Sequence, residues 1–220
     1  MKKNFWFTSD THFGHKRIPL YAKRKLFLNK EESKSAEKIW NSSSFVNWSP
    51  SWNSIKKMNE HLINKINQYV KKDDVLWHLG DFCFAKKEEL ESSVERYLNQ
   101  INCKNVFLIR GNHDDPKIYS YFKESYDIKE INVRNKLIIM NHYAQAVWRK
   151  SHSGSWMLYG HSHSTAENWL DQAMPGRLSM DVGVDNVYKI KGEYRPISFE
   201  EIEKIFLKRS GNSIDKNEFS

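Results

Sequence analysis

The sequence predicts an α/β domain built on mixed β-sheets. Short apolar runs of strand length, rich in β-branched and aromatic residues, recur along the chain. Segments with a single apolar face at helical spacing lie between several of the early runs. Strands alternate with helices in the first half and predominate later, and this order favours an α/β domain with mixed sheets.

Six apolar runs are expected to form strands. They are NFWFTSD (4–10), DVLWHLGD (74–81), NVFLIRGN (105–112), KLIIMNH (136–142), WMLYGH (156–161) and LSMDVGVD (178–185). Residues 132–137, NVRNKL, look like a turn between two paired strands, although Arg-Asn is a weaker hairpin signal than Asn-Gly.

Three segments are expected to form helices. Apolar residues recur at three- and four-residue steps in 54–70 and again in 86–101, which gives each segment one apolar face. A last helix begins near Ser198, because Ser198 and Glu201 have the spacing of a capping box. We expect a single domain over residues 1–210, and a flexible tail over the polar residues 211–220.

Composition narrows the class of protein. A chain of 220 residues suits one domain with a full core, and 39% hydrophobic with 14% aromatic residues excludes a disordered chain. The only two cysteines, Cys83 and Cys103, form neither a disulfide framework nor a zinc-finger spacing and fit a reducing compartment. No apolar stretch is long enough for a signal peptide or a membrane span, so we expect a cytoplasmic protein without a membrane partner.

The basic charge of the chain is concentrated near its start. The net charge is +8, and the first 40 residues contain ten Lys or Arg against four Asp or Glu. A basic excess near a site favours an anionic partner such as a nucleotide or nucleic acid. The alternative is an ordinary solvated lysine-rich surface, and composition alone leaves both open.

Several apolar runs end in a residue type that binds metals. The five run ends are Asp10, Asp81, Asn112, His142 and His161, and two of them are followed two residues later by His12 and His163. Ligands of open α/β sheets bind outside the carboxyl ends of the strands. A fold that gathers these ends would bring imidazoles, carboxylates and an amide together. One strand-ending Asp or His is usually a turn former or a cap, but five are hard to attribute to chance.

The order of these motifs resembles the calcineurin-like metallophosphoesterases, and in particular small stand-alone members from bacteria and phages. The matching motifs are Asp10-x-His12, Gly80-Asp81, Gly111-Asn112-His113-Asp114, Asn141-His142 and Gly160-His161-x-His163. Asn141 departs from the usual glycine, which affects loop geometry rather than ligation, and Ala144 stands where close relatives often have proline. The resemblance implies a four-layer αββα sandwich of two mixed β-sheets flanked by helices.

The resemblance also implies two divalent metal ions at the strand ends. By motif position, Asp10, His12 and His163 would hold one ion. Asn112, His142 and His161 would hold the other, and Asp81 would bridge both. Such ligands without a thiolate suit Mn²⁺, Fe²⁺, Zn²⁺ or Ni²⁺, of which we expect Mn²⁺. The implied reaction is hydrolysis of a phosphoester by attack of a metal-bridging hydroxide.

Other residues near the motifs are candidates for catalysis and substrate binding. By analogy with the family, His113 would lie near the leaving-group oxygen, where it would donate a proton or stabilise negative charge. Asp114 would orient the His113 ring, or cap a helix that begins near Pro116. Three further candidates for substrate contacts are His15, Arg17 and Arg110, although flanking charges are as often structural. His78, inside an apolar strand, is expected to be a core histidine.

Residues 28–53 look like an insertion or lid in the family layout. The stretch is rich in Ser, Asn and Lys but contains Trp40, Trp48 and Trp52. Long connections in compact domains are usually functional or disordered, and three tryptophans argue against simple disorder. They would close over the metals, stack on bases as aromatic residues do in single-strand binding, or pack on the body of the domain.

We therefore expect a binuclear metal-dependent phosphodiesterase that acts on a nucleotide or nucleic-acid substrate. No arginine cluster follows the motifs to meet the extra charge of a monoester, and the basic excess near the start suits a larger anion. The alternatives are a phosphomonoesterase such as a protein phosphatase, a nuclease on long DNA or RNA, and a non-catalytic scaffold. The scaffold is disfavoured because every motif ligand and His113 are present. The sequence leaves the oligomeric state open.

Overall fold

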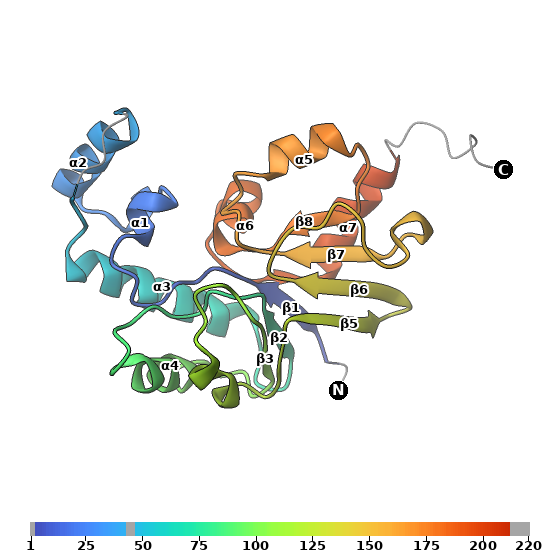
Figure 1. Ribbon diagram of the computed structural model, residues 1–220, viewed down its shortest axis with the longest axis horizontal. Helices are drawn as coiled ribbons and strands as arrows, with labels where there is room; N and C mark the ends of the chain where they lie inside the picture. Colours follow the sequence, from blue (N-terminus) through green and yellow to red (C-terminus); the bar gives the residue numbers. More distant parts are fainter. Residues whose placement is uncertain (1–2, 43–46, 212–220) are drawn as a thin grey trace.

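Two mixed β-sheets lie against each other in the computed structural model, with helices on their outer faces (Figure 1). The structure describes residues 3–42 and 47–211. This arrangement confirms the predicted α/β class and the layered sandwich of two mixed sheets flanked by helices.

The first sheet has five strands in the order β4-β3-β2-β1-β9. Their bounds are β1 Phe5–Thr8, β2 Val75–His78, β3 Val106–Ile109, β4 Ser125–Tyr126 and β9 Ile197–Ser198. The pairs from β4 to β1 are parallel, and β9 runs antiparallel to β1. Because Thr8 pairs with His78 and His78 with Leu108, the three central strands end level with one another. Their carboxyl ends therefore share one edge of the sheet.

The second sheet has four strands in the order β5-β6-β7-β8. Their bounds are β5 Ile128–Val133, β6 Lys136–Asn141, β7 Trp156–Tyr159 and β8 Ser179–Asp181. Strands β5 and β6 are antiparallel, and β6, β7 and β8 are parallel. The predicted turn between β5 and β6 is confirmed, and Arg134 and Asn135 both have positive φ, 48° and 64°. Two such residues are what a tight hairpin turn requires.

Successive side chains of the first sheet's strands point alternately into the core between the two sheets and into the core on the sheet's outer face. Phe7 of β1 and Trp77 of β2 point into the core between the sheets, where they meet Leu158 of β7. Leu76, one residue from Trp77, points to the opposite face. This is the two-residue period of a strand buried on both sides.

Helices cover both outer faces. Their bounds are α3 Trp52–Tyr69, α4 Leu90–Leu98, α5 Glu167–Ala173, α6 Val184–Lys191 and α7 Phe199–Gly211. Leu62 of α3 and Val94 of α4 join the core on the outer side of the first sheet, and Leu170 of α5 packs outside the second. Side chains of α6 and α7 extend the core between the sheets. No helix in the described ranges is both long and apolar enough to cross a membrane.

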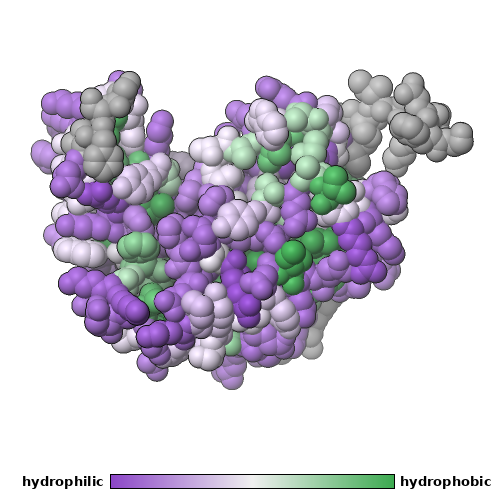
Figure 2. Space-filling model, viewed as in Figure 1, coloured by the Kyte–Doolittle hydropathy of each residue, from purple (hydrophilic) through white to green (hydrophobic). Residues whose placement is uncertain are grey.

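An N-terminal arm lies beside the start of α3 (Figure 1). It consists of α1 Ile18–Tyr21, the 3₁₀ turn η1 Lys25–Phe27 and α2 Lys30–Trp40, which begins with a capping box of Asn29 and Glu32. Glu32 also accepts hydrogen bonds from Ser51 N–H, at 2.6 Å, and from the Ser54 hydroxyl, which ties α2 to α3. The arm and the part carrying α5 stand on either side of a hollow in the surface (Figure 2).

Two of the three tryptophans in the predicted insertion pack within this arm. Trp40 and Trp48 pack against the cluster of Leu20, Leu28 and Ala36, and Trp40 Nε1–H donates to Leu20 O at 2.7 Å. Trp52 is different, because its side chain is 61% exposed at the first residue of α3. Part of the insertion, residues 43–46, lies outside the described residues, and so do residues 212–220 of the predicted tail.

Some predicted elements have other bounds in the structure, and some elements of the structure were not predicted. The predicted strand 178–185 contains only β8, and α6 begins at Val184 after a turn in which Asp181 Oδ1 accepts Gly183 N–H at 2.6 Å. Helices α5 and α6 and the two-residue strands β4 and β9 were not predicted, because they are too short to show a period. Gly211, assigned to the tail, is the last residue of α7. Two further 3₁₀ turns are η2 Pro116–Tyr121 and η3 Ser151–Ser153.

Candidate metal centre

The loops that follow the parallel strands of both sheets meet at one place. Asp10 N–H donates to Gly80 O at 2.9 Å, and Gly160 N–H donates to His142 O at 3.0 Å, so neighbouring loops stay paired after their strands end. The two sheets are joined here because His161 N–H donates to Asp10 Oδ2 at 2.9 Å. Two clusters of metal-binding side chains result, each with ligand atoms within 4.8 Å of one another: Asp10, His12 and His163, and Asp81, His142 and His161.

Asp81 connects the two clusters. Its Oδ2 lies 3.5 Å from Nε2 of His12, in the first cluster, and 3.6 Å from Nε2 of His142, in the second. Its Oδ1 accepts a hydrogen bond from His113 N–H at 2.9 Å, which fixes the carboxylate from the other side. One oxygen therefore faces both clusters.

Asn112 belongs to the second cluster. Its Oδ1 lies 3.0 Å from His142 Nε2 and 2.9 Å from His161 Nδ1. The structure thus brings together all seven residues that the sequence motifs nominate as ligands.

Two of the histidines are oriented by partners behind the clusters. His142 Nδ1 lies 2.7 Å from Leu79 O, and His163 Nδ1 lies 2.7 Å from Asp185 Oδ2. Both acceptors select the tautomer with a proton on Nδ1. Nε2 of each ring is then directed into its cluster.

Asp185 is itself held by a buried arginine that the sequence did not identify. Nε and Nη2 of Arg24 each lie 2.8 Å from an oxygen of Asp185, and Nη2 also donates to Asp10 O at 2.6 Å. Arg24 is completely buried. Through Asp185, it joins the Asp10 loop to His163. Asp185 is the last residue of the predicted strand 178–185, so it too stands at the end of an apolar run. Arg24 has no such mark, because it is one of ten basic residues among the first 40.

The first cluster contains buried polar atoms without protein partners. Among the described residues, Oδ1 of Asp10 and both ring nitrogens of His12 have no hydrogen-bond partner. Leaving such groups unsatisfied costs roughly 1–3 kcal/mol each. Asp10 Oδ1 and one ring nitrogen of His12 are donors of the kind that a divalent cation takes, so the residues present fit such an ion.

Most of the candidate metal ligands have a strained backbone conformation. Five of the seven have φ in the left-handed region, with values of 56°, 48°, 58°, 65° and 46° for Asp10, His12, Asp81, His161 and His163. Each such residue costs of order 1 kcal/mol and persists only where the surrounding structure imposes it. Gly160 adds a close approach, because a Cβ there would collide with Ser9 and with Asp10 Oδ2. These loops are shaped to direct side chains inward.

Burial and neighbouring charges set the protonation of the cluster. Burial alone would raise the pKa of Asp81, but its interaction with His142 holds that pKa well below its usual range. Burial opposes the charged form of His142 as well, yet Asp81 and Asp10 raise its pKa to about 9. Burial lowers the pKa of His12 well below its usual value, so the ring is neutral near neutral pH and one of its two nitrogens has a free lone pair.

His113 and His15 lie at the edge of the first cluster. The ring centroid of His12 is 5.7 Å from that of His113 and 5.6 Å from that of His15. His113 is exposed, whereas burial and the neighbouring His113 lower the pKa of His15 to about 4, which keeps its ring neutral at pH 7. Phe84 packs between them, 4.4 Å from the His15 ring and 5.9 Å from the His113 ring.

Asp114 has a different position from the one predicted. Its carboxylate accepts hydrogen bonds from Asp81 N–H at 2.8 Å, Gly111 N–H at 2.9 Å and Phe82 N–H at 3.0 Å. With these three bonds it holds the loop of the bridging carboxylate rather than the His113 ring. The predicted helix cap is also wrong, because the residue that caps η2 is Asp115.

The two candidate arginines are engaged with the protein. Arg110 pairs with Asp127 at 3.2 Å and lies over the Tyr119 ring at 4.5 Å. Arg17 donates to the side chains of Asn47 and Tyr21. These contacts give both arginines a structural role, and their contacts with a substrate stay a prediction.

Two residues beside the motifs have structural roles. His78 is confirmed as a core histidine, buried and 2.9 Å from the Thr11 hydroxyl. Asn141, in place of the usual glycine, accepts Tyr143 N–H at 2.7 Å through its side chain and so closes the turn before His142. Tyr143, which the sequence did not single out, lies exposed beside the His161 ring, with centroids 4.7 Å apart.

The sequence and fold of this chain are similar to those of known proteins. The chain is 28% identical over 209 residues to "Uncharacterized protein MJ1445" of Methanocaldococcus jannaschii, which covers 94% of this chain and 93% of that protein. Its fold is similar to the crystal structure of AQ665 from Aquifex aeolicus, a protein of unknown function, with a TM-score of 0.60 and 22% identity over 93% of this chain and 100% of that one. Residues 3–212 match the sequence profile of the calcineurin-like phosphoesterases. The chain therefore belongs to the calcineurin-like phosphoesterase family.

Proposed function

We propose that this protein is a phosphodiesterase that uses two divalent metal ions to hydrolyse a nucleotide or nucleic-acid substrate. The observation that carries the proposal is the position of Asp81, whose Oδ2 lies 3.5 Å from His12 Nε2 and 3.6 Å from His142 Nε2. A single carboxylate oxygen between two imidazoles from separate clusters suits a bridge between two cations.

The donor sets indicate which residues would hold the ions. Asp10, His12 and His163 would hold one, and Asn112, His142 and His161 the other. Carboxylate, imidazole and amide donors without thiolate suit Mn²⁺ and its neighbours in the first transition row. When bound, two such ions supply a water molecule of lowered pKa and positive charge for the phosphoryl oxygens.

The chain itself contributes a proton donor and its positioning. His113 is exposed at the edge of the first cluster, where its ring would protonate the departing oxygen of the ester. Its backbone N–H is bound to Asp81 Oδ1 at 2.9 Å, so the donor and the bridging carboxylate keep a fixed relation. His15, neutral at pH 7 because its pKa is lowered to about 4, would hydrogen-bond the substrate without adding charge.

The surroundings of the clusters favour a diester over a monoester. A monoester dianion needs additional cations, but Arg17 and Arg110 are held by Asn47 and Asp127. The exposed rings of Phe84 and Tyr143 instead flank the clusters, next to His15 and His161 respectively. Aromatic faces of this kind suit the second ester group of a diester.

The test compares two substrates on one preparation. The protein, loaded with Mn²⁺, is assayed at one pH with bis-nitrophenyl phosphate and with nitrophenyl phosphate, and Asp81→Asn serves as the blank for contaminating esterases. The proposal predicts a higher kcat/KM for the diester. A clear preference for the monoester that is absent from the blank would establish a phosphomonoesterase instead.

A further inference from the structure

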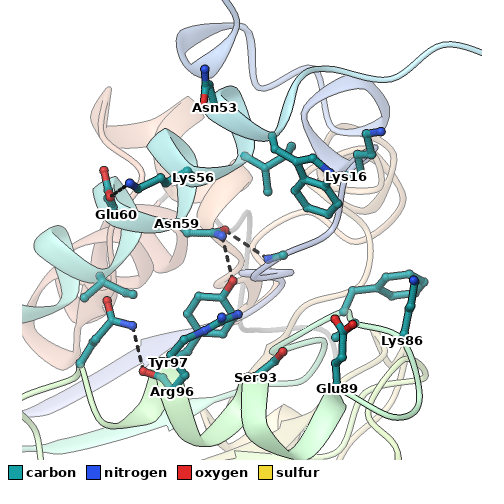
Figure 3. A pocket seen from close by; sticks show the side chains of 17 residues that line it. Lys16, Asn53, Lys56, Asn59, Glu60, Lys86, Glu89, Ser93, Arg96 and Tyr97 are labelled. Atoms are coloured by element: carbon teal, nitrogen blue, oxygen red, sulfur yellow. Dashed lines mark hydrogen bonds and ion pairs between the residues drawn. The ribbon is translucent and has the colours of Figure 1, made fainter.

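A pocket of about 670 Å³ opens between α3 and α4 (Figure 3). Its walls come from both helices, from the loop at Gly14 and Lys16, and from the loop that starts at Phe84. None of the seven candidate metal ligands lines it. The volume is in the range of small-molecule sites and is large enough for one nucleotide.

The pocket adjoins the His113 side of the metal centre. Phe84 lines the pocket, and its ring is 4.4 Å from the ring of His15 and 5.9 Å from that of His113. Gly14 and Lys16, which flank His15, also line it. The departing group of a substrate at the metal centre, if it leaves on the side of His113, would therefore lie next to this pocket.

Two exposed aromatic side chains line the pocket. Trp52 is 61% exposed and Phe84 is 43% exposed. Trp40 and Trp48, from the same stretch of chain as Trp52, are packed in the arm, so Trp52 is the tryptophan of this stretch that remains accessible. Accessible rings in a pocket suit a planar ligand, since every nucleobase can stack on them.

The charge of the pocket suits an anion. Four basic side chains line it against two carboxylates: Lys16, Lys56, Lys86 and Arg96 against Glu60 and Glu89. Lys16 Nζ lies 5.5 Å from the centre of the Trp52 ring, so a cation and an aromatic face are adjacent. In Figure 3, Lys16 and Lys86 stand on one side of the pocket. If a nucleotide stacked its base on the Trp52 ring, its phosphate would lie on the side of the pocket that carries Lys16 and Lys86.

Hydrogen bonds connect the walls of the pocket. Asn59 Nδ2 donates to the Tyr97 hydroxyl at 3.0 Å, and Asn59 Oδ1 accepts Gly14 N–H at 3.2 Å (Figure 3). These bonds tie α3 to α4 and to the loop that carries His15. Walls that are already held to one another reduce the ordering cost of binding a ligand.

We propose that this pocket binds the nucleoside on the leaving-group side of the substrate, with its base on Trp52 and Phe84 and its further phosphate beside Lys16 and Lys86. The inference rests on the proposed phosphodiesterase function and narrows its substrate class. The substrate is a linear diester between two nucleotides rather than a cyclic mononucleotide, whose departing oxygen stays on the same nucleoside.

Binding of a mononucleotide tests the pocket without turnover. Adenosine 5′-monophosphate is titrated calorimetrically into the protein in EDTA, and then into Trp52→Ala and Trp52→Phe. Loss of stacking is expected to weaken binding about tenfold in Trp52→Ala and much less in Trp52→Phe. The control is Trp169→Ala, because Trp169 is 68% exposed on α5, away from the pocket. No measurable binding, or equal binding by the parent and Trp52→Ala, overturns the proposal.

Kinetics on two esters separate the pocket from the catalytic centre. For a linear dinucleotide diester, Trp52→Ala is expected to raise KM about tenfold with little change in kcat. For bis-nitrophenyl phosphate, which does not need the pocket for a base, KM should change less than about twofold. An equal rise in KM for both esters overturns the proposal that the pocket binds the nucleoside. If the parent protein hydrolyses neither ester, the proposed function fails, while the nucleotide titration still decides the pocket.

Discussion

Asp185 Oδ2 lies 2.7 Å from Nδ1 of His163, and the same carboxylate forms two 2.8 Å bonds with the buried Arg24. Arg24 also donates to the backbone carbonyls of Asp10 and Thr11. Through this pair, the loops that carry the first cluster are fixed relative to each other. The orientation of His163 therefore depends on two residues that are not among the candidate metal ligands.

Asp185→Asn should weaken metal binding at the first cluster. The amide can no longer hold His163 in its tautomer by charge, and Arg24 is left as an unpaired buried cation. Loss of such a supporting partner typically lowers metal affinity on the order of 10–100-fold. The measurement is a Mn²⁺ titration of the variant. Asp171→Asn is the matched control, because Asp171 pairs with Arg177 and Arg209 in another part of the fold. Affinity equal to that of the parent would refute the role of Asp185.

His113→Ala should separate proton donation from metal binding. If the ring protonates the departing oxygen, the variant retains its metals and loses roughly 10²–10⁴-fold in kcat on an alkyl or nucleoside leaving group. The loss should shrink for nitrophenoxide, which needs almost no proton. His152→Ala, at an exposed position in η3, is the control. An equal loss with good and poor leaving groups contradicts the acid role.

Asp114→Asn should weaken metal binding rather than proton donation. Its carboxylate holds the backbone of Asp81, Phe82 and Gly111, so the change perturbs the bridging carboxylate rather than the His113 ring. We expect a lower metal affinity and a fall in kcat that is the same for good and poor leaving groups. Kinetics across a series of phenyl esters, at saturating Mn²⁺ and below it, measure this. A loss confined to poor leaving groups would restore the role predicted from the sequence.

Glu201→Gln should change the pH dependence of stability. Burial opposes the charge of Glu201, but its bonds to Arg195 and to Ser198 N–H lower its pKa to about 2. A carboxylate with a lowered folded-state pKa stabilises the fold above its unfolded pKa, and this stability is lost as the pH falls toward 2.

The variant should therefore lose about 1–2 kcal/mol of unfolding free energy at pH 7, after allowance for partial exposure. Between about pH 4.5 and pH 2 its stability should fall less steeply than that of the parent. Urea unfolding at several pH values measures both. Glu60→Gln is the control, since Glu60 forms an exposed pair with Lys56. Parallel pH curves for the parent and Glu201→Gln would contradict this account.

The parts of the fold that the sequence predicted are those with a clear period or a local motif. The central strands showed as apolar runs, α3 and α4 as apolar faces, and the start of α7 as the capping box of Ser198 and Glu201, whose two bonds are present at 3.1 and 3.2 Å. Strands β4 and β9 escaped prediction because two residues have no period. The helix α2 escaped because its polar sequence depends on a cap and on contacts with α1.

The residues of the candidate site also divide into those that a local pattern predicted and those that it did not. The seven ligand candidates were found because each lies at or just after the end of a buried run, and strand ends converge in this fold. Arg24 could not be found, since its partner Asp185 is 161 residues away and nothing local marks the pair. Asp114 was identified as a site residue, but its partners depend on how the loop folds back on Asp81. Local sequence thus predicts which residues enter the site better than what each one contacts there.

The most direct test of the account is the metal content of the parent protein and of Asp81→Asn, measured by mass spectrometry after loading with Mn²⁺, with turnover of bis-nitrophenyl phosphate on the same samples. The account predicts about two ions per chain in the parent. It predicts fewer ions and no turnover above background in Asp81→Asn, with an unchanged circular dichroism spectrum. A single ion in the parent, or near-normal turnover by folded Asp81→Asn at saturating Mn²⁺, would contradict the central claim that Asp81 bridges two metal ions.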